Sequence, residues 1–235
     1  MSQAEQDTAS TAKTTKGEQT RSRIVESAMH LFRDLGYDAT TMRAVAKEAG
    51  VSVGNAYYYF ASKEHLLQAY YHEVHASHEV VAEEIIENER DLLTRLRRIL
   101  YAKLDVIEPY HRFSGLLFKS AADPKSPLNP FHEESRAARE ESTKLFARVL
   151  DGSKIKIPQD IGAELPDLLW MYNMGIVLYW LHDDSEGRAR TRRLVDHTSE
   201  IVVRIIKLLA NPLLRPLRKS TLRLLKELRD IEGAR

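Results

Sequence analysis

Apolar side chains recur every three or four residues along most of the chain, and the glycines and prolines that would interrupt this pattern fall in a few clusters. Such spacing places side chains on one face of an α-helix, whereas the alternation typical of half-buried strands is not seen in the sequence. Ile24, Ala28, Leu31 and Leu35 show the pattern, and Gly36 follows them where a left-handed helix end favours glycine. The sequence therefore predicts an all-α protein.

These spacings divide the chain into helical segments and loops. The segments predicted to be helical are 22–35, 41–49, 52–60, 62–88, 91–107, 110–122, 131–150, 163–182, 187–210 and 213–231. The loops 123–130, which holds three prolines, and 151–162 separate the later segments. We expect four parts, namely a disordered tail over 1–19, a helix-turn-helix domain over 20–64, a larger helical domain over 65–210 and a C-terminal amphipathic helix over 211–235.

Composition excludes some functions and leaves others open. The 235 residues include no cysteine, so disulfides, thiolate nucleophiles and cysteine-ligated metal centres are excluded. The formal net charge of +1 neither favours nor excludes a nucleic-acid partner. Residues 1–20 lack the apolar run of a secretory signal, and the most apolar stretch, 168–181, is too short to span a membrane. We therefore expect a cytoplasmic protein without a membrane partner.

The stretch from Thr41 to Tyr59, TMRAVAKEAGVSVGNAYYY, predicts two short helices joined by a tight turn at Gly50. Glycine permits the positive φ that a sharp turn requires. Ala46, four residues before Gly50, is small enough to let the helices approach, and Ala56 fits the narrow core between them. This is the spacing of a helix-turn-helix.

The second of these helices presents hydrogen-bonding and aromatic groups where an ordinary solvated helix would present glutamates and lysines. Its outward positions are Val53, Gly54, Asn55, Tyr57 and Tyr58. The Asn55 amide offers a donor and an acceptor to a base edge, and Gly54 lets the backbone come close. Such a surface suits the major groove of DNA. The alternative is that residues 41–59 form a tight helical hairpin inside a core. A glycine turn alone does not distinguish this hairpin from a DNA-binding motif.

Four groups of residues complete a family pattern over residues 20–70. They are Thr40-Thr41-Met42-Arg43, Ala49-Gly50-Val51-Ser52, Tyr57-Tyr58-Tyr59-Phe60 and Ser62-Lys63-Glu64-His65-Leu66-Leu67. With them the segment resembles the N-terminal signature of the tetracycline-repressor-like (TetR) family. The resemblance implies a three-helix DNA-binding head on a larger helical domain that dimerises and holds a small ligand. It further implies a repressor that leaves a palindromic operator in double-stranded DNA when a lipophilic ligand binds.

Carried over residue by residue, the resemblance assigns DNA contacts to individual positions. The phosphate-contacting positions are Thr41, Tyr57 and Lys63. The base-facing positions are Met42, Val53, Gly54 and Asn55, and the predicted set is completed by Arg43 and Tyr58. Two residues depart from the family pattern, because Ala56 replaces a larger aliphatic residue and Val53 replaces a commonly polar or basic one. Base readout at Val53 would then be contact with a thymine methyl.

Aromatic and flexible apolar residues in the later helices could line a cavity between helices, where helical bundles often hold ligands. The ligand-binding candidates are Tyr101, Tyr110, Phe113, Phe118, Trp170, Met171, Met174 and Leu178. The same residue types are also typical of an ordinary helical core, and the pocket is mainly an implication of the family resemblance. We expect no cofactor.

A single helix-turn-helix head makes few DNA contacts, and two heads one DNA turn apart multiply them, so we expect a homodimer with a two-fold interface. Segments 163–182 and 187–210 are more apolar than one core-facing stripe requires. The interface candidates are Leu168, Tyr172, Gly175, Tyr179, Leu194, Val195, Val202, Ile205 and Leu209. The alternative is that both helices are buried within one subunit.

Other patterns point to chemistry only weakly. His72, His75 and His78 could share a metal, but His-Glu-x-x-His is not satisfied because Ala76 takes the second histidine position. We therefore predict no metal site. No phosphate loop or nucleophile elbow is present in the sequence, and Asp183 and Asp184 are expected to be solvated in a helix–helix turn. The alternative functions are a helical protein-interaction module and a metal-dependent hydrolase that uses the histidines.

The C-terminal segment carries leucines on one face and arginines and lysines on the other. A basic amphipathic helix of this kind can lie on a membrane surface. We expect it instead to pack its leucines against the larger domain and to solvate its basic residues.

Overall fold

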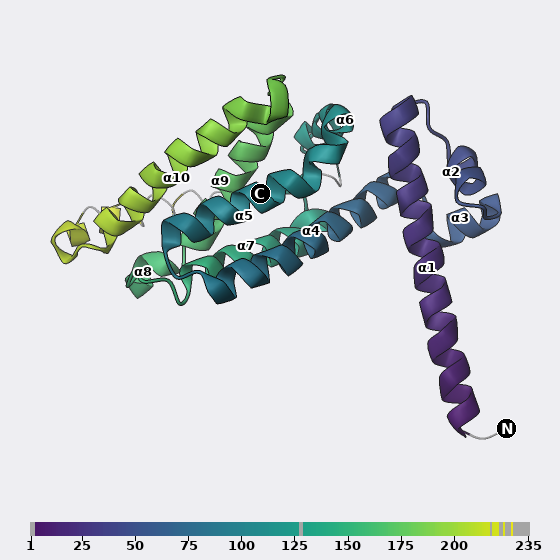
Figure 1. Cartoon of the computed structure of the whole chain (residues 1–235), viewed down its shortest axis with the longest axis horizontal. Helices are drawn as coiled ribbons and strands as arrows, with labels where there is room; N and C mark the ends of the chain where they lie inside the picture. The colour runs from purple at the N-terminus through teal and green to yellow at the C-terminus, as the bar shows by residue number, and fades with distance from the viewer. Residues whose placement is uncertain (1–2, 127–128, 217, 221–222, 224–226, 228–235) are drawn as a thin grey trace. The chain divides into compact units, whose positions relative to one another are not determined.

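The computed structural model describes residues 3–126, 129–216, 218–220, 223 and 227, and the secondary structure of this part of the chain is entirely helical (Figure 1). The α-helices are α1 (Gln3–Leu35), α2 (Met42–Glu48), α3 (Val53–Tyr59), α4 (Lys63–Asn88), α5 (Leu92–Ile107), α6 (His111–Ala122), α7 (Arg136–Leu150), α8 (Gln159–Gly162), α9 (Leu165–Leu181) and α10 (Ala189–Ala210). Short 3-10 turns lie at Glu108–Tyr110, Glu133–Ser135, Glu186–Arg188 and Pro212–Leu214. The all-α prediction is confirmed.

Several predicted boundaries differ from the structure, and the helix expected over 131–150 begins only at Arg136, after a 3-10 turn at Glu133–Ser135. The expected disordered tail over 1–19 is helical from Gln3, because α1 continues through it to Leu35. The segment is polar but rich in alanine, glutamate, glutamine and lysine, which favour helix, and it has no proline. The expected loop over 151–162 contains the short helix α8, which follows Pro158.

The chain forms two compact units. The first, the head unit, comprises 1–75 and 110–138, and the second, the C-terminal unit, comprises 76–109 and 139–235. The boundary expected between 64 and 65 lies inside α4, which starts at Lys63 and continues without a break. A continuous helix offers no exposed linker at that point, so the division falls further along, within α4.

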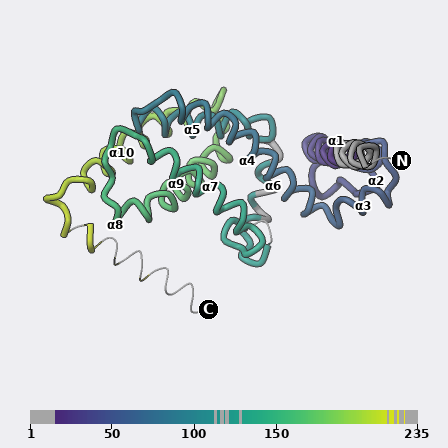
Figure 2. Tube along the Cα trace, turned by 90° about the horizontal axis from the view of Figure 1, so that it is seen from below, coloured from purple at the N-terminus to yellow at the C-terminus, as the bar shows by residue number. Residues whose placement is uncertain are grey.

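In the head unit α1 packs against α2, and α2 packs against α3. Figure 2 looks along α1 and shows α2 and α3 on the same side of it. The core between them consists of fully buried apolar side chains: Ile24, Val25, Ala28, Val45, Ala46 and Ala56. The small alanines at 46 and 56 let the short helices approach each other, as the spacing predicted.

In the C-terminal unit α10 packs along α5 and also contacts α9 (Figure 1). Leu96, Ile99 and Leu100 from α5, with Val195 from α10, are completely buried. Ile99 and Leu100 lie three and four residues after Leu96, so α5 turns one apolar face toward this core.

A polar cluster ties the α9–α10 turn to the end of α5. The Trp180 indole donates to Glu108 Oε2 at 2.7 Å, and Arg188 Nε donates to Glu108 Oε1 at 3.2 Å. Arg188 has a positive φ of 55°, a conformation that is uncommon for a residue with a side chain. Its Nη1 also donates to the Asp183 carbonyl at 2.6 Å, so the two contacts hold the strained residue in place.

Asp183 itself is buried, which corrects the expectation that solvation explains it. Only 3% of the residue is exposed, whereas the neighbouring Asp184 is exposed and pairs with Arg190 at 3.1 Å. The Asp183 carboxylate accepts hydrogen bonds from the amides and hydroxyls of Ser185 and Thr191. It therefore connects the end of α9 to the first turn of α10.

A buried arginine connects three helix ends in the C-terminal unit. The Arg95 guanidinium is inaccessible to solvent and donates to backbone carbonyls, an arrangement that satisfies the charged group without a carboxylate partner. Its Nη1 donates to Val149 O at 3.1 Å and to Asp151 O at 2.7 Å, and its Nη2 donates to Ile86 O at 2.7 Å. The last turn of α4 and the end of α7 thus share one side chain of α5.

Most of the predicted C-terminal amphipathic helix lies outside the described residues. Within them, Arg218 is buried and donates to Asp160 Oδ2 at 2.8 Å and to Leu209 O at 2.9 Å. Among the described helices none combines the length and the apolar character needed to cross a membrane.

Candidate nucleic-acid interface

Both short helices of the helix-turn-helix begin at a capping side chain. Thr41 Oγ1 accepts from the Ala44 amide at 3.2 Å at the start of α2, and Ser52 Oγ accepts from the Asn55 amide at 3.1 Å at the start of α3. Each hydroxyl satisfies an amide that the first helical turn leaves unbonded. Between the helices Gly50 has a φ of 64°, the positive value that the tight turn was predicted to need.

α3 buries one side chain, half-buries Tyr59 and exposes the other five residues. Ala56 is fully buried, whereas Val53, Gly54, Asn55, Tyr57 and Tyr58 are exposed, and Tyr58 reaches 81%. We call these five exposed residues the recognition face. A Cβ placed on Gly54 would meet no other atom within 4 Å, so the backbone there is open to an approaching surface. The structure therefore places the predicted outward positions together on one side of a capped helix.

Met42 does not fit its predicted base-facing role. The side chain is only 6% exposed and belongs to the core of the head unit. It is the first residue of α2 and lies one helical turn before Val45 and Ala46, which are both fully buried, so the helix turns it inward. Its neighbours Thr41 and Arg43 are exposed and remain on the surface.

Lys63 is held by Tyr37, which is not one of the predicted site residues. Its Nζ donates to the Tyr37 carbonyl at 2.7 Å and lies 4.3 Å from the centre of the Tyr37 ring. The Tyr37 hydroxyl donates to Glu64 Oε1 at 2.7 Å, and burial, followed by this carboxylate, raises the pKa of the phenol. Tyr37 thereby links the α1–α2 loop to the start of α4, and no spacing in the sequence indicates that contact.

The ligand-binding candidates do not gather in one place. Tyr110 and Phe118 belong to the head unit, while the side chain of Phe113, also in that unit, lies outside the described residues. In the C-terminal unit Trp170 is buried, Met174 is half-buried and Met171 and Leu178 are exposed. The Tyr101 hydroxyl donates to Asp196 Oδ1 at 2.7 Å. None of the candidates lines the cavity bounded by residues 147–166 or the one bounded by residues 18–26.

The dimer candidates are distributed between the surface and the core. Gly175, Tyr179 and Ile205 are exposed, and Val195 is fully buried, so Val195 belongs to the core of its own subunit. The half-buried candidates are Leu168, Tyr172, Leu194, Val202 and Leu209. Tyr172 is also engaged within the subunit, because its hydroxyl lies 2.6 Å from Thr198 Oγ1.

Exposed positions on α9 and α10 form stripes at helical spacing. On α9 they are Met171, Gly175 and Leu178, and on α10 they are Ile201, Ile205 and Leu208. We call these six residues the outer stripes. Met171 and Leu178 were predicted as pocket residues, but their exposure places them on this outer surface. Ile201 and Leu208 contribute to the apolar surplus of segment 187–210 but were not among the interface candidates, although their spacing around Ile205 by three and four residues was a usable signal.

The histidines of α4 form no metal cluster in the part of the chain that the structure describes. His72 is exposed, whereas His75 and His78 are buried. The Nε2 atom of His78 lies 2.9 Å from the Ile99 carbonyl of α5. This histidine therefore has a structural contact between two helices of the C-terminal unit.

Both parts of the chain match sequence families. Residues 24–70 match the family described as "Bacterial regulatory proteins, tetR family", and residues 95–223 match "Tetracyclin repressor-like, C-terminal domain". The transcriptional repressor KstR of Rhodococcus jostii is 51% identical over 47 residues, which are 20% of this chain and 22% of that protein. The regulator UidR of Escherichia coli K12 is 38% identical over 55 residues, 23% of this chain and 28% of its own. The matches thus span less than a third of either relative.

Solved structures share the fold over most of the chain. A TetR transcriptional regulator from Nitrosomonas europaea aligns with a TM-score of 0.59 and 17% identity, and the alignment covers 77% of this chain and 96% of the other. FadR of Thermus thermophilus, a TetR-family repressor crystallised with lauroyl-CoA, aligns with a TM-score of 0.51 and 22% identity, covering 79% and 92%. Identities this low show likeness of fold. The C-terminal match alone covers more than half of the 235 residues, so the chain belongs to the TetR family of bacterial transcriptional regulators.

Proposed function

We propose that this protein is a transcriptional repressor that binds a palindromic operator through its helix-turn-helix and is released by a small lipophilic ligand. The observation that carries the proposal is the recognition face of α3. Its five residues are exposed together while Ala56 anchors the same helix in the core. An anchored helix with an uncharged, hydrogen-bonding outer face is the geometry that major-groove recognition requires.

The proposed DNA contacts divide by chemistry. Asn55 and Val53 would read base edges, Asn55 through its amide and Val53 against a thymine methyl. Thr41, Arg43 and Tyr57 would contact phosphates through exposed donors. Lys63 would contribute a further phosphate contact, because its ammonium keeps donors beyond the one given to Tyr37.

The operator is proposed to be bound by a homodimer. The outer stripes on α9 and α10 expose apolar side chains in a region where both helices already bury their other faces against α5 and each other. Apolar stripes left over after a core is filled are typical of an association surface. Two α9 and two α10 helices would form a four-helix bundle, in which the absent side chain of Gly175 permits close approach.

A small lipophilic ligand is proposed to release the protein from its operator. The support for this release is that FadR, a structural neighbour, was crystallised with lauroyl-CoA. The mechanism would be a population shift in which the ligand favours a spacing of the two heads that no longer matches successive major grooves. A ligand achieves this only by the difference between its affinities for the two states.

The proposed DNA mode is tested by measuring operator affinity against salt concentration. Arg43→Gln is expected to weaken binding to all sequences and to reduce the salt dependence by about one ion. Asn55→Ala is expected to relax preference at one base position by about 1–3 kcal/mol while leaving the salt dependence unchanged. Arg98→Gln, which changes an exposed arginine of α5, is the matched control. Equal behaviour of Arg43→Gln and Arg98→Gln would remove Arg43 from the interface.

A further inference from the structure

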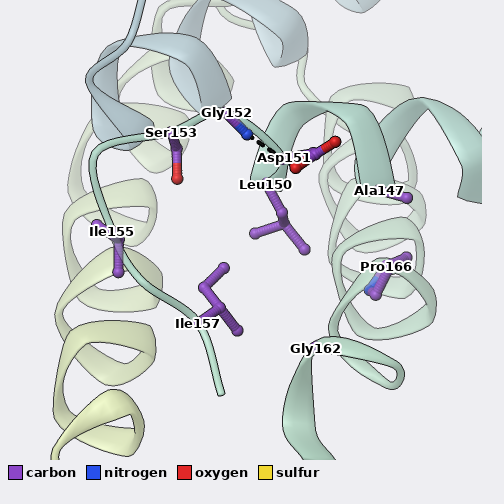
Figure 3. A pocket seen from close by; sticks show the side chains of 9 residues that line it. All are labelled: Ala147, Leu150, Asp151, Gly152, Ser153, Ile155, Ile157, Gly162 and Pro166. Carbon is purple, nitrogen blue, oxygen red and sulfur yellow. Dashed lines mark hydrogen bonds between the residues drawn. The ribbon is translucent and has the colours of Figure 1, made fainter. Parts of the chain in front are cut away.

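The loop between α7 and α8 borders an open cavity of about 380 Å³ in the C-terminal unit. Its lining residues come from α7, the loop, the end of α8 and the start of α9: Ala147, Leu150, Asp151, Gly152, Ser153, Ile155, Ile157, Gly162 and Pro166. Figure 3 shows the side chains of Leu150, Ser153 and Ile157 directed into the same space. The volume is at the lower end of the range of about 300–1,000 Å³ typical of ligand pockets, so it suits a small molecule.

Successive side chains of the loop alternate between the cavity and the solvent. Ser153, Ile155 and Ile157 line the cavity, while Lys154 and Lys156 between them are exposed to solvent. The loop therefore presents two isoleucines and a serine toward the cavity. Leu150 adds a third aliphatic side chain. The cavity therefore has three aliphatic side chains on its wall, together with the polar residues Asp151 and Ser153.

The Ser153 hydroxyl has no partner among the described residues. The Oγ of Ser153 is inaccessible to solvent and makes no hydrogen bond. A buried hydroxyl without a partner costs free energy in the folded protein, and a polar group entering the cavity would remove that cost. The unsatisfied hydroxyl therefore indicates where the polar end of a ligand would lie.

A cation lies beside the same part of the loop. The Arg90 Nη1 atom is 3.1 Å from the position that a Cβ on Gly152 would occupy, and the Arg90 carbonyl accepts from the Lys154 amide at 3.0 Å. The one acidic side chain of the lining, Asp151, accepts from the Gly152 amide at 3.0 Å (Figure 3). An arginine that reaches this close to Gly152 can pair with an anionic group bound near Ser153.

We infer that this cavity, which we call the loop cavity, binds a small amphipathic carboxylate. The aliphatic tail would lie against Leu150, Ile155 and Ile157, and the carboxylate would accept from the Ser153 hydroxyl and from Arg90. None of the ligand-binding residues expected from the sequence lines this cavity.

The wall of the loop cavity is connected to α4 through Arg95. The carbonyls of Val149 and Asp151, on either side of the lining residue Leu150, accept from Arg95 Nη1, and the Ile86 carbonyl of α4 accepts from Nη2 of the same guanidinium. A ligand that displaces Leu150 or Asp151 therefore disturbs hydrogen bonds that also hold the last turn of α4. An effect of this on operator binding rests on the proposed function, whereas binding to the cavity does not.

The inference is tested by titrating the full-length protein with octanoate in a calorimeter, with octanol and octylamine as neutral and cationic probes of the same length. Octanoate is expected to bind, and the other two are expected to bind at least about tenfold more weakly. Octylamine binding as tightly as octanoate would overturn the assignment of an anionic ligand, and absence of octanoate binding would overturn the site.

Two variants locate the site. Ser153→Ala is expected to weaken octanoate binding about tenfold while leaving the melting temperature of the free protein unchanged or higher, because an unsatisfied hydroxyl is lost. A purely structural hydroxyl would instead lower the melting temperature and leave octanoate binding intact. Arg90→Gln is expected to weaken octanoate binding, whereas the matched control Arg98→Gln is not. Equal octanoate affinity in both arginine variants would remove Arg90 from the site.

Hydrogen exchange and operator binding separate this inference from the proposed function. Octanoate is expected to change the protection of amides 84–89 in the parent protein and not in Ser153→Ala. Octanoate binding without any operator binding would contradict the proposed function and leave the cavity assignment standing. Operator binding without octanoate binding would contradict the cavity assignment and leave the proposed function standing.

Discussion

At the scale of single residues, the α9–α10 turn depends on one carboxylate. Asp183 accepts from the Ser185 and Thr191 hydroxyls at 2.6 and 2.7 Å and from their amides at 3.0 and 2.8 Å. Burial alone would raise the pKa of Asp183, but these hydrogen bonds to the charged form outweigh it and hold the pKa well below the ordinary value. The carboxylate therefore stays ionised and joins α9 to α10.

Asp183→Asn is expected to lower the free energy of unfolding by about 3 kcal/mol at pH 7, because an amide cannot accept at both positions and leaves buried donors unpaired. Asp184→Asn, at the exposed neighbour, is expected to change it by less than about 0.5 kcal/mol. Urea denaturation measures both. The contribution of the Asp183 carboxylate to the free energy of unfolding is present above the unfolded pKa of about 4 and is lost as the pH falls. The free energies of unfolding of the two variants should therefore become equal in acid. A constant difference down to pH 2 would contradict this account.

Lys103 contrasts with Asp183, because burial disfavours its charged form. It lies one helical turn from each of Ile99 and Ile107 on the buried face of α5. Burial lowers its pKa from 10.5 to about 8. The unfolded chain binds the proton more tightly than the folded chain, so stability should rise as the pH increases from 8 to 10.5.

Lys103→Met is expected to raise the free energy of unfolding at pH 7 by about 1–3 kcal/mol and to remove the rise in stability above pH 8. Lys144→Met, which changes an exposed lysine of α7, should do neither. Thermal melting over a pH series provides the measurement. A loss of stability in Lys103→Met would show that the ammonium has a stabilising partner in the folded protein.

At the scale of elements, the head helices are short and rely on caps. α2 and α3 have seven residues each, too few to be stable helices by themselves, so capping and packing must hold them. The spacing of Ala46, Gly50 and Ala56 was sufficient to predict both helices and the turn. The exposure of Tyr57 and Tyr58 followed from the same helical period. The burial of Met42 was not predicted, since the position of a residue in a family pattern does not show whether the first residue of a helix faces the core or the solvent.

Ser52→Ala is expected to destabilise the protein by about 1 kcal/mol, because the Asn55 amide loses its acceptor at the start of α3. Ser52→Asn should restore most of the stability, since its side-chain oxygen can cap. Ser52→Asp should also cap but should weaken binding to operator DNA, because it adds a negative charge beside the recognition face. Denaturation and gel shift on the three variants test the cap and the docking independently. Equal operator affinity of the Asn and Asp variants would place α3 away from the DNA.

At the scale of the whole molecule, the exposed apolar side chains of α9 and α10 form the surface that we propose for association. Ile205 is 49% exposed on an outer stripe, whereas Val203, two residues earlier, is buried in the subunit core. The two positions are chemically similar and differ in the direction in which α10 turns them. They therefore distinguish the stability of the subunit from that of the dimer.

Ile205→Glu is expected to give a monomer that keeps its helical circular dichroism and loses tight operator binding, because two charges would meet at a two-fold interface. Val203→Glu is expected to unfold the subunit, because it buries an unpaired charge. Sedimentation velocity and circular dichroism distinguish the two outcomes. A dimer that persists in Ile205→Glu would move the interface away from the outer stripes.

The sequence by itself determined the features that depend on local periodicity and on residues with special backbone geometry. The helical class and the helix-turn-helix follow from three- and four-residue spacing and from a glycine that tolerates a φ of 64°. Such signals lie within a few residues of one another, so no distant part of the chain is needed to interpret them.

Only the tertiary structure decided which side chains meet across long separations in the sequence. Tyr37 with Lys63, Arg95 with the end of α7, and Arg90 with Gly152 all depend on how helices pack. Aromatic residues such as Trp170 can fill a core or line a cavity equally well, and composition does not distinguish the two. A cavity exists where packed elements leave space, and that space is a property of the assembled helices and of no single segment.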